Sequence, residues 1–225
     1  MTWAQHYAKW SLCNRCELCF NRTKSVLGMG KVAHGDMPGA EVFVVGQYPG
    51  KDEDKIGQPM QGAGGQWVHW AIAKVAQIHY DKCFFTNILA CTPIAKPKVG
   101  EVQAKKGPKE AAASKEKISI RKDFTERCGV RVREALDLVK PKLIVSMGLV
   151  AAKFFSNDPQ IKMGVISGSR GKFLGYPVVY TTHPFEPARQ ATAQGKKESE
   201  AKVIRDFQMV RRVAVELGIL DREAE

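Results

Sequence analysis

The sequence lacks any long apolar run. No window of its 225 residues approaches 18 consecutive apolar residues, and the first six, Met1–His6, contain no apolar segment of the kind that opens a secretory signal. We therefore expect neither a membrane-spanning helix nor export, and we expect a cytoplasmic protein, associated with a nucleoid or of viral origin. No internal repeat is visible, so a repeat array is not expected either.

Acidic residues are scarce relative to basic ones. The chain has 35 Lys and Arg against 23 Asp and Glu, a formal net charge of +12. Such a charge suits a polyanionic partner, and composition alone leaves DNA, RNA and an anionic membrane open. With 26% charged and 44% hydrophobic residues the composition is that of an ordinary globular protein, expected as a single domain over residues 1–225.

The chain has six cysteines. They are Cys13, Cys16 and Cys19, spaced by two residues each, and the distant Cys83, Cys91 and Cys128. In a cytoplasmic protein, thiols indicate a metal site or chemistry more than disulfides. A Cys-x-x-Cys pair can hold zinc or part of an iron–sulfur cluster, and both remain open at this point. The remaining ligands must come from the distant cysteines.

Short apolar runs alternate with helical patterns along the chain. Strands are predicted at 41–45, 83–89, 142–146 and 171–181, the last as a strand or hairpin. Helices are predicted within 3–24, after the glycine-rich segment 57–65, and at 128–139, 149–156 and about 196–217. The alternation predicts an α/β fold, a three-layer α/β/α sandwich around a mainly parallel central sheet.

Residues 92–127 interrupt this pattern. They hold ten Lys and Arg against five Asp and Glu, together with three prolines. We expect an exposed, partly mobile basic insertion, with a plain solvated linker as the alternative.

The segment 42–54 is the most informative part of the chain. An apolar strand ends at Gly46, and Pro49 and Gly50 then lead to three consecutive acids. Parallel strands deliver such loops to the carboxyl edge of the sheet, where open α/β folds bind ligands. Acids at the tip of a loop are usually solvated, but their position directly after a buried strand makes them candidates for catalysis.

Three loops should converge at this edge: 46–54, 86–91 and 181–189. The amide of Asn87 carries a donor and an acceptor that can match the imide edge of a pyrimidine. The imidazole of His183 can donate to a developing oxyanion. The carboxylate of Glu53 or Asp54 can orient water or stabilise a cationic sugar.

Several short motifs follow one another in a fixed order. They are Cys13-Asn-Arg-Cys16 with Arg22-Thr23, Gly46-Gln-Tyr-Pro-Gly-Lys-Asp-Glu-Asp54, Gly57-Gln-Pro-Met-Gln-Gly62, Thr86-Asn-Ile-Leu-Ala-Cys91, Lys140-Pro-Lys-Leu-Ile-Val-Ser-Met-Gly148, Arg170-Gly171 and His183-Pro184. Together they resemble the family 4 uracil-DNA glycosylases, the iron–sulfur type of the uracil-DNA glycosylase superfamily. The resemblance covers residues 10 to about 190.

The resemblance implies a structural [4Fe–4S] cluster. Its ligands would be Cys13, Cys16, Cys91 and Cys128, with Cys19 and Cys83 spare. The resemblance also implies a monofunctional hydrolase of base excision repair, acting as a monomer on double- or single-stranded DNA. Such an enzyme flips uracil, or a related altered base, out of the stack and hydrolyses its N-glycosidic bond.

The family pattern also implies a role for each site residue. Asn87 would read the base edge, His183 would stabilise negative charge on the departing base, and Glu53 would position water or support the sugar cation. Asp54 would then support the loop and Asp52 would face solvent. The residues that would line the base pocket are Gly46, Gln47, Tyr48, Met60, Gly62 and Asn87. The residues that would contact DNA are Arg170, Phe185 as a wedge and Arg189 at a phosphate.

The chain departs from the family pattern at several site positions. They are Gln47 in place of Glu, Tyr48 in place of a small residue, Met60 in place of Phe, Phe185 in place of Ser and Ala90 in place of Lys. Two alternatives therefore stay open: a weak or inactive protein of this fold that binds DNA as a replication accessory factor, and a glycosylase for a different modified base. A zinc-binding nucleic-acid module would leave the strand-end loops unexplained.

Overall fold

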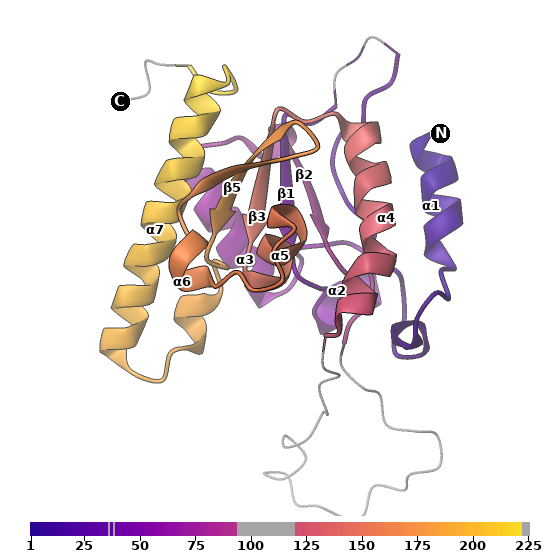
Figure 1. Cartoon of the computed structure of the whole chain (residues 1–225), viewed down its shortest axis with the longest axis horizontal. Helices are drawn as coiled ribbons and strands as arrows, with labels where there is room; N and C mark the ends of the chain where they lie inside the picture. The colour runs from indigo at the N-terminus through magenta and orange to yellow at the C-terminus, as the bar shows by residue number, and fades with distance from the viewer. Residues whose placement is uncertain (36, 38, 94–119, 222–225) are drawn as a thin grey trace, which may run out of the picture.

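A five-stranded sheet forms the centre of the computed structural model, which describes residues 1–35, 37, 39–93 and 120–221 (Figure 1). The strand order is β2-β1-β3-β5-β4, with β4 alone antiparallel to its neighbour. The strands are β1 (Val42–Gly46), β2 (Cys83–Asn87), β3 (Leu143–Met147), β4 (Arg170–Phe173) and β5 (Tyr176–Thr181). The predicted α/β fold with a mainly parallel sheet is therefore confirmed. Most of the predicted insertion, residues 94–119, lies outside the described residues.

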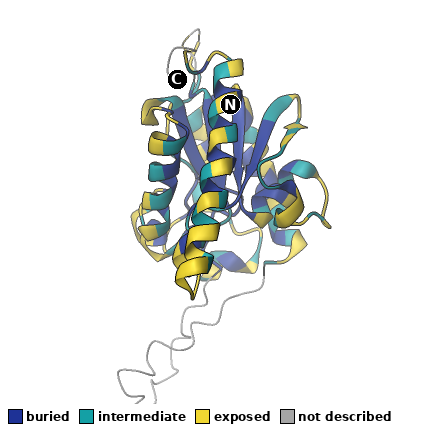
Figure 2. Ribbon diagram, turned by 90° about the vertical axis from the view of Figure 1, so that its left-hand side faces the viewer, coloured by how far each residue is buried: buried dark blue, intermediate teal, exposed yellow. Residues whose placement is uncertain are grey.

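Helices cover both faces of the sheet. The α-helices are α1 (Trp3–Ser11), α2 (Lys51–Ile56), α3 (Ala63–Trp70), α4 (Lys122–Val139), α5 (Leu149–Ser156), α6 (Met163–Ile166) and α7 (Ala193–Glu216). A π-helical segment (Ala71–Val75) continues α3, and 3-10 turns lie at Glu17–Phe20, Tyr80–Lys82 and Glu186–Arg189. Helices α4 and α5 pack on one face of the sheet and α3 and α7 on the other, with α1 outside α4 (Figure 1). Figure 2 shows the buried strands between helices whose outer sides are exposed.

Alternate residues of β1 enter two separate hydrophobic clusters. Phe43 and Val45 pack with α4 and α5, whereas Val42 and Val44 pack with α3 and α7. All five residues of the strand are buried, since helices cover both faces. This two-sided burial explains why β1 is a continuous apolar run in the sequence.

A two-residue loop joins β4 to β5. Leu174 and Gly175, with φ of 50° and 88°, form the turn of an antiparallel hairpin. The segment 171–181, predicted as a strand or hairpin, is therefore a hairpin.

The three acids after Gly50 lie on a helix, and their predicted place at the tip of a loop is wrong. Helix α2 begins after Gly50 and ends at Gly57, which has a φ of 87° that favours glycine. Acids in a first turn are favoured by the helix dipole. Glu53 and Asp54 are only 8% and 4% exposed, while Asp52 is exposed as expected.

Helix α4 begins at Lys122, earlier than the start predicted at Cys128. Phe124, one turn before Cys128, is fully buried in the same cluster, so the apolar stripe of the helix extends toward its N-terminus. Cys128 consequently lies inside the helix and points to the core. None of the described helices is both long and apolar enough to cross a membrane.

Val210 on α7 provides a test of the core. Its side chain is fully buried, and Val210→Ala should lower the free energy of unfolding by about 2 kcal/mol, because two buried methyl groups are lost and a cavity remains. The matched control is Val165→Ala in α6, where the side chain is 81% exposed and the change should be below about 0.5 kcal/mol. Urea unfolding of both variants measures the difference, and equal losses would contradict the described packing.

Candidate active site

The carboxyl ends of four parallel strands meet at one edge of the sheet. Gly46, the last residue of β1, lies opposite Asn87, the last residue of β2. On the other side of β1, the Gly148 N–H after β3 donates to the Thr181 carbonyl at the end of β5, at 2.9 Å. Because β2 and β3, which are consecutive in the chain, lie on opposite sides of β1, this edge is a topological switch point, where open α/β sheets bind ligands.

Asn87 and Met60 lie against the backbone of Gly46. A Cβ atom on Gly46 would stand 2.4 Å from Asn87 Oδ1 and 3.2 Å from Met60 Cε, so a side chain at this position would displace the Asn87 amide. Met60 has a left-handed φ of 59°, and its carbonyl accepts a hydrogen bond from His69 Nε2 at 3.0 Å. A strained residue held in this way beside a strand end is typical of a functional site.

Glu53 joins the loop after β1 to the start of α3. Its Oε1 accepts a hydrogen bond from the Gly62 N–H at 2.9 Å, and its Oε2 lies beside Gly50. The carboxylate of Asp54 accepts from the Thr23 N–H at 2.8 and 3.0 Å, so it ties α2 to the segment that follows the first cysteines. Glu53 thus joins two loops near this edge of the sheet, and Asp54 has the supporting place expected of it.

His183 follows the end of β5, and its half-buried ring is held in one orientation. Its Nδ1 accepts a hydrogen bond from the Phe185 N–H at 3.2 Å, which leaves the ring proton on Nε2. Burial, together with a smaller contribution from the nearby charge of Arg189, lowers the pKa of His183 to about 4. The imidazole is therefore neutral near pH 7 and keeps Nε2–H as a donor.

Other predicted pocket and DNA-contact residues lie around these. Phe185 lies across the glycine-rich start of α3, with its Cγ 3.8 Å from where a Cβ on Gly64 would stand. The guanidinium of Arg189 is 5.3 Å from the Phe185 ring centre.

Three further predicted site residues, Gln47, Tyr48 and Arg170, have identifiable neighbours. Gln47 extends over Gly148, since a Cβ there would be 2.3 Å from Gln47 Nε2. Tyr48 packs against the cluster under α4, whereas Met60 belongs to the cluster on the other face. Arg170 stands apart, in a two-bond ion pair with Glu216 at 2.6 and 2.8 Å.

Cys16 and Cys91, two of the predicted ligands, lie within electrostatic reach of other cysteines. Burial raises the pKa of Cys16, and the neighbouring Cys128, Cys13 and Cys19 act in the same direction. Burial also raises the pKa of Cys91 to about 12, with added contributions from Cys128 and Cys16. Arg22 opposes this rise, because its guanidinium donates to Cys91 Sγ at 3.6 Å. All six cysteines are free thiols.

These thiols form an all-sulfur donor set drawn from the end of α1, the loop after β2 and α4. Such a set fits an iron–sulfur cluster. Cys83 is separate from these thiols, as expected of a spare buried thiol. It lies in the hydrophobic cluster between the sheet and helices α3 and α7. Within the described residues, no three His, Cys, Asp or Glu side chains gather closely enough to hold a single metal ion.

Arg131 is not among the residues predicted from the sequence. Its side chain is 1% exposed and lies beside the cysteines, at hydrogen-bonding distance from the end of β2. The available signal was an arginine on the apolar stripe of the helix predicted at 128–139, three residues after Cys128.

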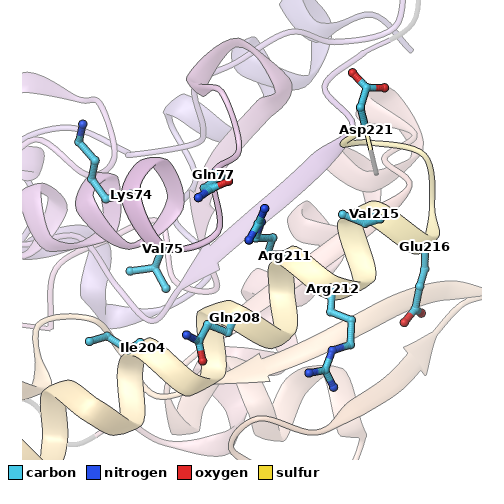
Figure 3. Close-up of a pocket in the computed structure, with 10 residues that line it drawn as sticks. All are labelled: Lys74, Val75, Gln77, Ile204, Gln208, Arg211, Arg212, Val215, Glu216 and Asp221. Atoms are coloured by element: carbon cyan, nitrogen blue, oxygen red, sulfur yellow. The ribbon is translucent and has the colours of Figure 1, made fainter. Parts of the chain in front are cut away.

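A surface hollow of about 610 Å³ lies away from this edge. It is lined by the π-helical segment after α3 and by the second half of α7, including Lys74, Gln77 and Arg211 (Figure 3). None of the predicted site residues lines it.

Comparison with known proteins agrees with this geometry. The family model of the uracil DNA glycosylase superfamily matches residues 32–208. The chain belongs to this superfamily. The match contains the strand ends, Glu53, Asn87 and His183, but it begins after the first three cysteines.

Several curated superfamily proteins are similar to the chain, and each is named a type-4 uracil-DNA glycosylase. The protein from Sulfurisphaera tokodaii is 28% identical over 71% of this chain and 60% of its own length. The one from Archaeoglobus fulgidus is 28% identical over 71% and 66%, respectively, and the one from Pyrobaculum aerophilum is 25% identical over 84% and 85%. The chain therefore spans about two thirds or less of the first two relatives.

The pKa of His183 gives a testable pH dependence. Because the folded-state pKa is about 4 and that of an unfolded histidine is about 6.5, only the unfolded chain takes up this proton between those pH values. The contribution of His183 to stability is thus fully present above pH 6.5 and is lost as the pH falls toward 4. An NMR titration should show the His183 ring neutral down to about pH 5 when folded and titrating near 6.5 in urea. Titration near 6.5 in the folded protein would contradict the described burial.

Proposed function

We propose that this superfamily member is a monofunctional DNA glycosylase that hydrolyses the N-glycosidic bond of uracil, or of a related altered base, in base excision repair. The observation that supports the proposal is the position of Asn87, Glu53 and a neutral His183 at or just after the carboxyl ends of parallel strands of one sheet. The names of the relatives support the choice of uracil.

The end of β2 recognises the base. A flipped-out base binds at this sheet edge, where the Asn87 amide pairs with the imide edge of the base and the Met60 thioether packs on its ring. Gly46 and Gly62 let the backbone approach the base. Asn87 is 3% exposed and lies against Gly46, which favours one amide orientation and hence discrimination between bases.

His183 and Glu53 promote cleavage of the N-glycosidic bond. As the bond between the sugar C1′ and the base nitrogen breaks, its electron pair passes to the base, and His183 Nε2–H donates to the oxygen that gains charge. A neutral donor suits this step, because it need not lose its proton. Glu53 stabilises the cationic sugar and orients the water whose oxygen bonds to C1′. The proton that this water loses balances the one that the departing base anion takes up, so the products are the abasic sugar and the neutral base.

The cysteine site completes the assignment. We assign a [4Fe–4S] cluster to Cys13, Cys16, Cys91 and Cys128, which is supported by the electrostatic contact among these thiols and by the type-4 relatives. When bound, the cluster supplies a rigid cross-link between three segments. The chain's own residues carry out the hydrolysis.

The segment 183–189 contacts the DNA, and the positive charge of the chain attracts it. Phe185 inserts where the base leaves the stack, and Arg189 binds a phosphate. Arg170 can bind a phosphate only after its ion pair with Glu216 opens.

A different modified base is the second candidate substrate. Two residues at the sheet edge favour it. Met60 offers a base less flat surface for packing than an aromatic ring would, and Gln47 fills the space over Gly148. This candidate uses the same chemistry with another base.

An assay of base release, read as strand cleavage by alkali at the abasic site, tests the assignment. With duplex and single-stranded oligonucleotides that carry uracil, the wild-type protein should leave an alkali-labile abasic site. Asn87→Ala and His183→Ala should each lower kcat by about 10²–10³-fold, because each removes a hydrogen bond that strengthens in the transition state. His79→Ala, at a side chain 73% exposed, is the matched control and should retain full activity.

The remaining outcomes separate the alternatives. Undiminished release by both variants would refute the assigned site. Release from oligonucleotides carrying hypoxanthine, xanthine or a hypermodified base, but not uracil, would select the second candidate. No release from any of them, with salt-sensitive DNA binding retained, would indicate a binding protein of this fold.

A further inference from the structure

Arg131 links α4 to the end of β2. Its guanidinium is 1% exposed, and Nη1 donates to the Leu27 carbonyl at 2.7 Å and to Thr86 Oγ1 at 3.1 Å. Nη2 donates to the Asn87 carbonyl and, at 3.3 Å, to the Ile88 carbonyl. The planar guanidinium thus collects backbone oxygens from two segments at the point where the base-reading strand ends.

The charge of this guanidinium has no carboxylate partner in the part of the chain that the structure describes. The acidic groups that act on it are the thiols of Cys128, Cys91 and Cys13. Burial lowers the pKa of Arg131 and the three cysteines oppose this fall, yet arginine stays charged in proteins. A buried charge is costly unless an opposite charge compensates it.

Compensation becomes available when the cysteine site is filled. Thiols must lose their protons to bind a metal, so a filled site places thiolates beside Arg131. Cys128 precedes Arg131 by one helical turn, and Cys91 lies four residues beyond Asn87. One side chain therefore contacts both the surroundings of the cysteine site and the backbone of Asn87.

Hydrogen bonds also join the residues after β2 to the end of β1 and the loop that follows it. The Ile88 N–H donates to the Gly46 carbonyl and the Leu89 N–H to the Gln47 carbonyl, both at 3.0 Å. A shift of the carbonyls held by Arg131 would therefore move Asn87 relative to Gly46. Misplacement of a reacting or positioning group by about 1 Å can reduce a rate about 10²-fold.

We propose that Arg131 is a positioning residue that couples the filled cysteine site to the placement of Asn87. It acts as the buried counter-charge of the thiolates and as the support of the Asn87 and Ile88 carbonyls. The inference rests on the proposed function for the identity of the cluster and the role of Asn87.

Three variants of the iron-loaded protein separate the two roles. Arg131→Met removes the charge and the hydrogen bonds, Arg131→Lys keeps the charge but not the planar fork, and Arg133→Met removes an exposed arginine on the same helix as a control. The measurements are iron content, the reduction potential of the cluster, and kcat and KM for a uracil oligonucleotide.

The account predicts a distinct result for each variant. Arg131→Met should shift the potential to a more negative value, because loss of a buried positive charge disfavours an added electron, and should lower kcat about 10-fold or more with little change in KM. Arg131→Lys should keep the potential near that of the wild type but show the same fall in kcat. Arg133→Met should match the wild type in all three. Wild-type potential and kcat in iron-loaded Arg131→Met would overturn the proposal.

Hydrogen exchange in the wild-type chain decides the matter if the variants do not fold. Removal of iron by a chelator should speed exchange of the Ile88 and Leu89 amides more than that of the Ile144 and Val145 amides in β3. Equal changes at both strands would overturn the proposal. A wild-type protein that binds no iron and releases no base would refute the proposed function itself, whereas a loaded and active wild type with unaltered variants would refute only the role of Arg131.

Discussion

The parallel pairing of β1 with β2 is the interaction on which the site depends. It sets Gly46 opposite Asn87, and the missing side chain of this glycine leaves room for the Asn87 amide and the Met60 side chain where they lie. The two hydrophobic clusters fix β1 from both faces, so the strand end has little freedom to move. The positions of Gly46 and Asn87 are therefore set by the sheet itself.

Polar contacts then attach the loops to this edge. Glu53 binds the Gly62 N–H, Asp54 binds the Thr23 N–H, and Arg22 donates to Cys91 Sγ. The first contact spans nine residues, and the other two span 31 and 69. Each is at least partly buried, where a hydrogen bond to a charged group contributes more than on the surface. In the proposed account the cysteine site adds a further cross-link to this set, and Arg131 carries its effect to Asn87.

Local sequence patterns predicted much of this arrangement. The strands predicted at 41–45 and 142–146 are observed one residue later, and the helix at 149–156 has the predicted bounds. These elements have continuous apolar runs or clear glycine boundaries, which depend on neighbouring residues alone. The early start of α4 was missed because it depends on the burial of Phe124 against distant segments.

The sequence predicted which residues belong to the candidate site better than it predicted the contacts of their side chains. Asn87, Glu53 and His183 follow strand ends, and topology alone brings these to one edge. The direction of a side chain depends on tertiary partners: Gln47 extends over Gly148, and Arg170 pairs with Glu216, 46 residues away. The burial of Arg131 likewise follows from carbonyls of Leu27 and Asn87 that no local pattern contains.

Stepwise reconstitution tests most directly the claim that the cysteine site keeps the catalytic edge in shape. Iron-free protein is supplied with increasing iron and sulfide, and base release, iron content and binding of undamaged duplex are measured at each step. The account predicts that release rises in proportion to the fraction of chains with a complete cluster, while binding of undamaged duplex changes far less. Full release by iron-free protein, or by protein holding zinc in its place, would contradict it.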